Sequence, residues 1–284
     1  MWQALQHAFL HTLEDALKLL PFLLIAYILI EWLEHRAGER LQGFLARSGR
    51  FGSVIGGLLG MVPQCGFSVA CANFYAGRIV TTGTVVAVML ATSDEALPLL
   101  IANRAAPDKI LMLLASKLII GVVTGVIVDA LYKRKDALPE HELCRDCGCH
   151  HDHGFVKSVL LPALRHVGAI ALFIVVITFL LNFVIELIGE AQLAALLGGD
   201  SILQPVLCAI FGFIPNCAVS VVITELYMSQ SLSLGSAVAG LCTGAGTGML
   251  VLFRANRNIK ENLFITAVMF IAAVSSGILL HLIV

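Results

Sequence analysis

The chain alternates between long apolar segments and short polar ones from end to end. A helix needs about 20 predominantly apolar residues to cross a bilayer. Two apolar segments, residues 52–77 and 203–229, have a proline near their middle and are predicted to form broken helical hairpins. Runs of this length, without alternation over ~10 residues, argue against a membrane β-barrel. Six more segments are predicted as full membrane spans: residues 14–34, 82–102, 109–131, 166–188, 233–253 and 262–284.

Composition supports the same class. The chain has 284 residues, of which 58% are hydrophobic and 13% are charged, and its mean hydropathy is +0.92. Soluble domains contain about 25% charged residues, so we expect an all-α polytopic membrane protein. Residues 16–34 are too long for the apolar core of a signal peptide and lack a small-residue cleavage site, which predicts a permanent first span.

The sequence matches itself without a gap at a shift of 152 residues. Nine positions between residues 60 and 91 are identical to their partners, and chance would give roughly two. The match predicts two structural copies of one unit. The identical pairs are Gly60/Gly212, Pro63/Pro215, Cys65/Cys217, Ser68/Ser220, Val69/Val221, Tyr75/Tyr227, Gly83/Gly235, Val86/Val238 and Ala87/Ala239.

The basic residues predict that the two copies are inverted. Basic residues favour cytoplasmic loops, whereas residues 189–201 contain no Lys or Arg and are expected outside. The chain after the first span of each copy then lies on opposite sides of the membrane, which is typical of secondary transporters. Arg104 and Lys109 fall outside in this arrangement and are exceptions. The residues expected to be cytoplasmic are Arg36, Arg40, Arg47, Arg50, Lys133, Arg134, Lys135, Lys157, Arg254, Arg257 and Lys260.

The predicted organisation follows from the repeat. Residues 1–132 form the first transmembrane repeat, residues 133–157 a cytoplasmic Cys/His-rich loop, and residues 158–284 the second, inverted repeat. Each repeat has three spanning helices and a broken helical hairpin, which gives about ten helices when the hairpin arms are counted.

The repeated Pro-amide-Cys phrase predicts a substrate site. Proline stops the helix before it, and the residues after Pro63 and Pro215 start a second half-helix whose free N–H groups point at the membrane interior. Two facing thiols suit a soft metal or a trivalent metalloid. Small packing residues are the alternative role for membrane cysteines, and it is the role expected for Cys71, Cys208 and Cys242. The candidate substrate-binding residues are Gln64, Cys65, Ser68, Asn216, Cys217 and Ser220.

Acidic residues in apolar segments predict an ion path. Asp94 and Glu95 lie within a predicted span, where acidic groups are costly and usually serve ion or proton transfer; the alternative places them near the outer surface. Residues 243–250 are their glycine-rich counterpart, suited to close helix approach or another break. Glu225 is a further ion-coupling candidate. Lys117 is expected to extend its ammonium from a span end towards water, as long cationic side chains do.

The central loop predicts metal binding. Residues 141–153 contain three cysteines and four histidines in a Cys-x-x-Cys-x-Cys-His pattern, which offers thiolate and imidazole ligands for zinc or softer ions. The alternative is a flexible polar linker. No cofactor is expected to be required. The candidate metal ligands are Cys144, Cys147, Cys149, His150, His151 and His153.

These phrases also resemble those of a known family. VPQCGFSVA, IPNCAVSV, TSDEALP and the Cys/His-rich loop are similar to the ten-helix heavy-metal exporters, bacterial proteins labelled arsenic efflux proteins or manganese transporters. The resemblance covers nearly the whole chain. It implies export of a metal or metalloid across the bacterial inner membrane, and the expected direction of transport follows from it alone.

Three functions remain open at this point. The first is a proton- or sodium-driven exporter of a metal cation or metalloid, because no phosphate-binding GxxxxGK[ST] loop is present for ATP. The second is an anion carrier that uses the hairpin helix N-termini for an oxyanion, a carboxylate or a lipid phosphate. The third is a membrane enzyme or sensor built on the Cys/His loop. No nucleophile–base set supports an enzyme, and the expected partners are the ion and membrane lipid, without nucleic acid.

Overall fold

The computed structural model describes residues 49–62, 65–92, 96–132 and 203–283, together with a few scattered positions elsewhere. All regular elements in that part of the chain are helices. The predicted first span of each repeat and the Cys/His loop lie outside the described residues. The helices are α3 (Gly49–Gly60), α4 (Cys65–Ala76), α5 (Thr82–Ala91), α6 (Ala96–Ala102), α7 (Pro107–Leu131), α10 (Gln204–Gly212), α11 (Cys217–Met228), α12 (Leu234–Thr243), α13 (Thr247–Ala255) and α14 (Ile259–Ile283).

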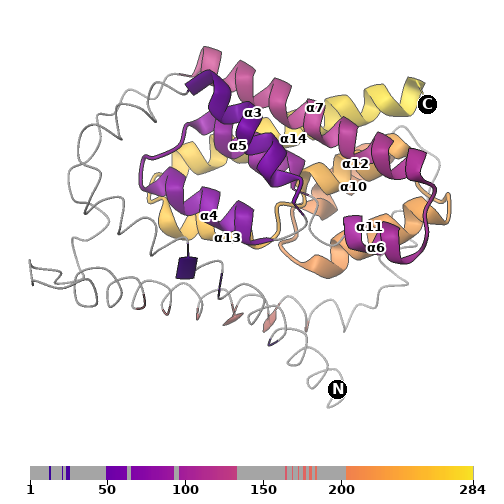
Figure 1. Cartoon of the computed structure of the whole chain (residues 1–284), viewed down its shortest axis with the longest axis horizontal. Coiled ribbons are helices and arrows are strands. Elements are labelled where there is room, and N and C mark those ends of the chain that lie inside the picture. The colour runs from indigo at the N-terminus through magenta and orange to yellow at the C-terminus, as the bar shows by residue number, and fades with distance from the viewer. Residues whose placement is uncertain are drawn as a thin grey trace, which may run out of the picture.

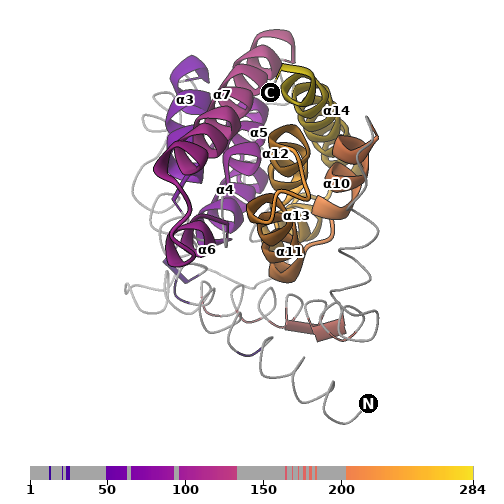
Figure 2. The ribbon, with the colours of Figure 1, turned by 90° about the vertical axis from the view of Figure 1, so that its right-hand side faces the viewer.

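The helix boundaries repeat at the shift found in the sequence. Helices α4, α5 and α7 begin and end 152 residues before α11, α12 and α14, and α3 and α10 end at equivalent glycines. The turn after α4 has its counterpart after α11, where Arg78 and Gln230 both adopt a positive φ, of 62° and 61°. The two copies predicted from the sequence are therefore two copies of one helical unit, shown on opposite sides of the molecule in Figure 2.

The two longest helices, α7 and α14, form an antiparallel pair. Each has 25 residues, enough at 1.5 Å per residue to cross a bilayer. Tyr132 at the end of α7 stacks on Phe264 near the start of α14, with ring centroids 4.7 Å apart. Figure 1 shows the same opposite directions. This arrangement agrees with an inverted repeat, while the membrane side of each end stays a prediction.

Only one stripe of α7 and α14 is buried. On α7 the stripe repeats at four-residue spacing through Leu113, Lys117, Gly121 and Gly125. The other faces present large apolar side chains such as Leu111. A helix with one packed stripe and apolar remaining faces fits a position between a protein core and lipid. Among the residues that the structure describes, four stretches are long and apolar enough to span a membrane: Thr82–Ala102, Pro107–Leu131, Leu234–Ala255 and Ile259–Ile283.

The core is built on two short central helices. Every residue of α5 and α12 is buried, and each helix has ten residues, about half of a bilayer core at 1.5 Å per residue. The sequence predicts spans here, with close helix approach or a break as the two options for the glycine-rich residues 243–250, and the structure shows the break. Helix α12 ends at Thr243 and α13 begins at Thr247, because Gly244–Gly246 leaves the helix, with Gly246 at φ 50°. At the equivalent place α5 ends at Ala91 and α6 begins at Ala96.

The two predicted hairpins are broken where expected, but their arms pack on different partners. Helices α3 and α10 end at Gly60 and Gly212, and α4 and α11 begin at Cys65 and Cys217, immediately after the Pro-amide pairs. Helix α3 packs mainly on α5 and α7, whereas α4 lies beside α13 of the other repeat, and α11 lies beside α6 (Figure 1). The second arm of each hairpin therefore packs against a helix of the other repeat.

Glycine contacts hold the long helices against the central ones. A Cβ on Gly83 would lie 2.1 Å from the Gly125 carbonyl oxygen, and a Cβ on Gly235 would lie 2.2 Å from that of Gly277. Both distances are far below a van der Waals contact, so the backbones approach closely at equivalent points in the two repeats. Small residues at such crossings are typical of membrane helix packing.

Replacing Gly83 with Ala should destabilise the protein. The added Cβ forces α5 away from α7, and overpacking of this kind typically costs about 1–3 kcal/mol. Thermal denaturation in detergent, followed by size-exclusion chromatography, measures the loss. Gly168→Ala is the matched control, because its Cβ would meet nothing within 4 Å. Equal melting temperatures for the two variants would contradict the close packing of α5 on α7.

Candidate functional site

Helix breaks from both repeats meet at the segment between α12 and α13. Ser68 in the first turn of α4 lies against Gly248 in the first turn of α13, where a Cβ on Gly248 would lie 2.6 Å from the Ser68 Cβ. Ser220 in the first turn of α11 lies on the other side, and its Oγ would be 3.3 Å from a Cβ on Gly244. The segment from Gly244 to Gly248 is thus enclosed by the starts of both half-helices that follow the Pro-amide pairs.

We call the segment from Gly244 to Gly248, with the starts of α4 and α11 around it, the centre. Its electrostatics come from the helix ends. Helices α4, α11 and α13 start there, and the first four N–H groups of a helix lack partners within it and form its positive end. Helix α12 ends there and contributes carbonyl oxygens. The centre therefore offers both donors and acceptors from the backbone at a depth where lipid offers neither.

The structure positions part of the predicted substrate set. Ser68 and Asn216 are buried and Ser220 is half-buried. Cys65 and Cys217 are the first residues of α4 and α11, and their side chains lie outside the described residues. The following predicted site residues also lie outside them: Gln64, Asp94, Glu95, Cys144, Cys147, Cys149, His150, His151 and His153.

The remaining cysteines have the packing role expected of them. Cys71, Cys208 and Cys242 are buried with free thiols inside the hydrophobic core. Within the described ranges, no three side chains of the His, Cys, Asp or Glu type lie together in a group able to hold a metal ion.

Thr247 is a candidate site residue that sequence reasoning missed. It is the first residue of α13, is 5% exposed, and its Oγ1 has no hydrogen-bond partner among the described residues. Unsatisfied buried hydroxyls are rare and each calls for a reason. A signal was present in the sequence, because the shift of 152 residues places Thr247 opposite Glu95, one of the ion-coupling candidates.

The prediction for Lys117 was wrong. Its side chain is 1% exposed, in the middle of α7, and does not extend towards water. The ammonium donates to the backbone carbonyl of Thr92, at the end of α5, and to that of Leu241, in the last turn of α12, at 2.9 Å for Leu241. Two negative helix ends, one from each repeat, compensate the lost hydration of this cation.

A second polar cluster lies at the end of the molecule where α14 begins, and we call it the Glu261 network. Glu261 is 5% exposed. Tyr75 donates its hydroxyl to the carboxylate at 3.1 Å, Asn256 donates its amide at 3.3 Å, and Arg78 forms an ion pair at 3.7 Å. Asn256 also donates to the side-chain oxygen of Asn262 at 2.7 Å. The network joins α4 of the first repeat to α14 of the second.

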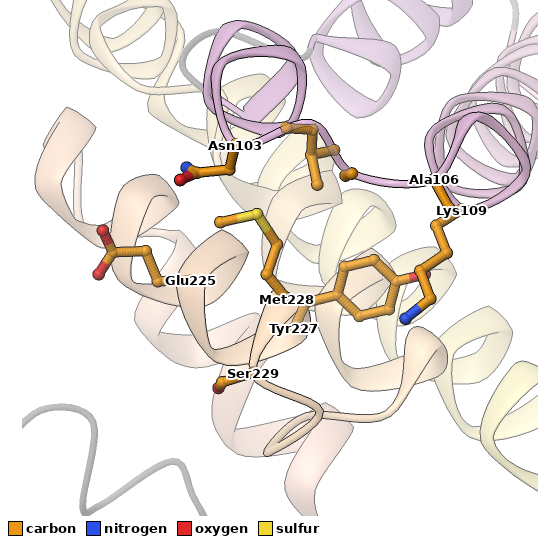
Figure 3. Close-up of a pocket in the computed structure, with 9 residues that line it drawn as sticks. Asn103, Ala106, Lys109, Glu225, Tyr227, Met228 and Ser229 are labelled. Atoms are coloured by element: carbon orange, nitrogen blue, oxygen red, sulfur yellow. The ribbon is translucent and has the colours of Figure 1, made fainter.

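A cavity of about 470 Å³ occupies the equivalent place at the opposite end. It is lined by Lys109 and Tyr227, the counterparts of Glu261 and Tyr75 at the 152-residue shift, and by Asn103, Met228 and Glu225. Figure 3 shows Tyr227 and Met228 between Lys109 and the Glu225 carboxylate, which is exposed and turned away from Lys109. The same positions thus form a closed network at one end and an open cavity at the other.

A comparison with models of known protein families shows which family the chain belongs to. Residues 5–159 and 167–284 match the model of the family described as "Putative, 10TM heavy-metal exporter". The chain belongs to this family. The match extends over nearly the whole chain, so this heavy-metal exporter family member is an integral membrane protein with the all-helical architecture described above. No curated protein and no solved structure matched in the corresponding comparisons.

Thr247→Val and Thr243→Val should differ in their effect on the stability of this exporter family member. Thr247 loses no hydrogen bond, so Val should leave the melting temperature unchanged or raise it, by up to about 1 kcal/mol of unfolding free energy. Thr243 donates to the Ala209 carbonyl at 2.8 Å, so Val there should cost about 1–3 kcal/mol. Thermal denaturation of both variants in detergent measures the difference. A lower melting temperature for Thr247→Val would mean that its hydroxyl is satisfied.

Proposed function

We propose that the chain is a secondary transporter that exports a divalent metal cation or metalloid across the bacterial inner membrane. The substrate binds between the two Pro-amide-Cys tips, with Gln64, Cys65, Asn216 and Cys217 as candidate ligands. The observation that supports this is the meeting of the first turns of α4 and α11 at the break between α12 and α13. Membership of a heavy-metal exporter family supports the class of substrate.

The donor chemistry of the centre suits a soft ion. Thiolates select soft metals and trivalent metalloids, and both half-helices start at a cysteine. Ser68, Ser220 and the unpartnered Thr247 hydroxyl add oxygen groups beside these helix starts. A hydroxyl without a protein partner at this point is expected to bind the substrate or a water that the substrate keeps.

Ion coupling is proposed for Asp94, Glu95 and Glu225. Asp94 and Glu95 directly precede α6, whose partner α11 begins at the proposed site. Glu225 also belongs to α11, eight residues after its first residue Cys217, and lines the cavity. A proton or sodium ion entering through the cavity would meet Glu225 before it reaches the centre.

The two unequal ends support alternating access by movement of one repeat against the other. Inverted repeats create equivalent pathways at opposite ends, one closed while the other is open. Arg78, Arg254, Arg257 and Lys260 lie at the end with the Glu261 network, whereas Arg104 and Lys109 lie at the cavity end. Basic residues favour the cytoplasm, so we assign the closed network to the cytoplasmic side and the cavity to the outside.

An anion carrier remains the second candidate, and the buried Lys117 favours it. A cation buried in an apolar interior attracts negative charge. Its ammonium, however, already bonds two carbonyls at negative helix ends. We therefore place the metal or metalloid first. Family membership also favours transport over catalysis or metal sensing, with membrane lipid as the surrounding partner.

Exchange of both tip cysteines for serine should separate the two candidates. Reconstituted Cys65→Ser/Cys217→Ser protein should lose at least about tenfold in uptake of zinc, cadmium or arsenite, because hydroxyls bind soft ions poorly. Cys71→Ala is the control, since this buried cysteine has a packing role on the same helix as Cys65. Flux of phosphate that is indifferent to the double exchange, with no metal flux, would establish the anion carrier instead.

Glu261→Gln should open the cytoplasmic end. The substitution removes the ion pair with Arg78 and weakens a charge-assisted bond from Tyr75, and such bonds contribute about 1.5–3 kcal/mol. Hydrogen exchange of residues 77–82 and 256–258 should then rise by about tenfold or more. Lys260→Gln, an exposed neighbour on the same turn of α14, is the control. Unchanged exchange in Glu261→Gln would show that the network does not hold this end closed.

A further inference from the structure

The cavity and the Glu261 network occupy equivalent positions in the two repeats, but their polar groups are partnered differently. In the network, Tyr75 donates its hydroxyl to the Glu261 carboxylate at 3.1 Å. The counterparts of these two residues, Tyr227 and Lys109, line the cavity (Figure 3). Among the described residues, neither the Tyr227 hydroxyl nor the Lys109 ammonium has a hydrogen-bond partner. The bond that closes one end of the molecule is therefore unmade at the other.

The donor and acceptor roles are reversed between the two ends. Glu261 only accepts hydrogen bonds, and Arg78, which only donates, lies 3.7 Å from it as an ion pair. At the cavity end the acid is replaced by Lys109, and the counterpart of Arg78 is Gln230. A second cation at this position would repel Lys109, whereas the amide oxygen of Gln230 is able to accept from its ammonium. The two exchanges together keep the groups complementary.

The backbone presents these side chains in the same way at both ends. Arg78 and Gln230 follow α4 and α11 with positive φ, of 62° and 61°. Each donates its N–H to the carbonyl of the residue three positions earlier, at 3.0 Å and 3.1 Å. Glu261 and Lys109 are each the third residue of a long helix, α14 and α7. The local structure is thus prepared for contact at both ends, and the separation of the repeats decides where contact is made.

One contact of the Glu261 network has no equivalent at the cavity end. Asn256 donates its amide to Glu261 at 3.3 Å, and its counterpart is Arg104, a cation that cannot accept from Lys109. Arg104 is exposed and does not line the cavity. The carboxylate of Glu225 is turned away from Lys109 (Figure 3). Contact at this end is therefore expected from three side chains, without Arg104 or Glu225.

We propose that Lys109, Tyr227 and Gln230 form an outer gate. In the state that opens to the cytoplasm, the Lys109 ammonium donates to the hydroxyl oxygen of Tyr227 and to the side-chain oxygen of Gln230, and the cavity closes. The Glu261 network opens in the same movement. Each state then has one polar network made and one unmade, so bonds lost at one end are replaced at the other. This inference rests on the proposed transport function and names the residues that close its outer side.

The test measures how accessible the cavity is in liposomes that contain the full chain. Met228 lines the cavity, so the rate at which a membrane-impermeant maleimide modifies Met228→Cys reports the open fraction. Protein that keeps Met228 gives the background from the native cysteines. Adding Gln230→Glu should slow modification by about tenfold or more, because a carboxylate binds Lys109 more strongly than an amide does.

Two matched variants test whether charge is the cause. Gln230→Arg places a cation opposite Lys109 and should leave modification of Met228→Cys at least as fast as with Gln230. Lys109→Glu combined with Gln230→Arg restores opposite charges, with the same residue types as the Glu261 and Arg78 pair, and should slow modification again. Equal rates in Gln230→Glu and Gln230→Arg, or fast modification in the double exchange, would overturn the proposal.

A further comparison covers the case in which Gln230→Glu does not fold. Glu261→Gln weakens closure at the opposite end and should slow modification of Met228→Cys while Lys109 is present, but not together with Lys109→Gln. Equal slowing in both backgrounds would contradict the outer gate. Modification needs no substrate, so its failure is distinct from a failure of transport. Wild type that carries no zinc, yet shows these charge effects, would refute the metal substrate and support the gate.

Discussion

The need to satisfy backbone polar groups away from water determines most of this structure. Lipid offers no hydrogen bonds, so a helix can break at membrane depth only where protein surrounds the break. The chain breaks in both repeats, after Gly60, Ala91, Gly212 and Thr243. The arms that follow are exchanged between repeats, so that α4 lies on α13 and α11 on α6. This exchange encloses each break in helices from both halves and creates the centre that we propose as the substrate site.

The repeat preserves hydrogen-bond positions while it changes the charges. Thr81 caps α5 and donates to Asp129 at 2.9 Å, whereas Ser233 caps α12 and lies 2.7 Å from the His281 ring. Asp129 and His281 are counterparts at the 152-residue shift. The carboxylate of Asp129 can only accept a hydrogen bond, whereas a ring nitrogen of His281 can either donate or accept one. The fold tolerates this because the hydroxyl of the capping residue is able to donate or accept.

The sequence was informative where a local rule applies and uninformative where tertiary packing decides. Proline and the repeat predicted that a second half-helix starts just after Pro63 and just after Pro215, and this is confirmed by α4 and α11, which begin at Cys65 and Cys217. The break at Gly244–Gly246 was weighed only as an option, because glycine also permits close helix packing. Lys117 was misjudged because burial of a lysine depends on acceptors that are distant in sequence, here 25 and 124 residues away. The orphan hydroxyl of Thr247 likewise becomes visible only when its surroundings are known.

Departures from the repeat are the places where a transporter of this kind would differ between its two directions. Perfect inverted symmetry would make both ends equivalent and would give no preference to either state. Here the pairs Lys117/Met269, Glu261/Lys109 and Glu95/Thr247 break the symmetry in charge. Lys117 bonds across the contact between the repeats. Glu261 belongs to the closed network at one end, whereas Lys109 lines the cavity at the other. Glu95 directly precedes α6, and Thr247 begins α13 next to the proposed site. Since α4, α5 and α7 repeat in the backbone as α11, α12 and α14 and these side chains do not repeat, we expect any preference for one direction to come from the side chains.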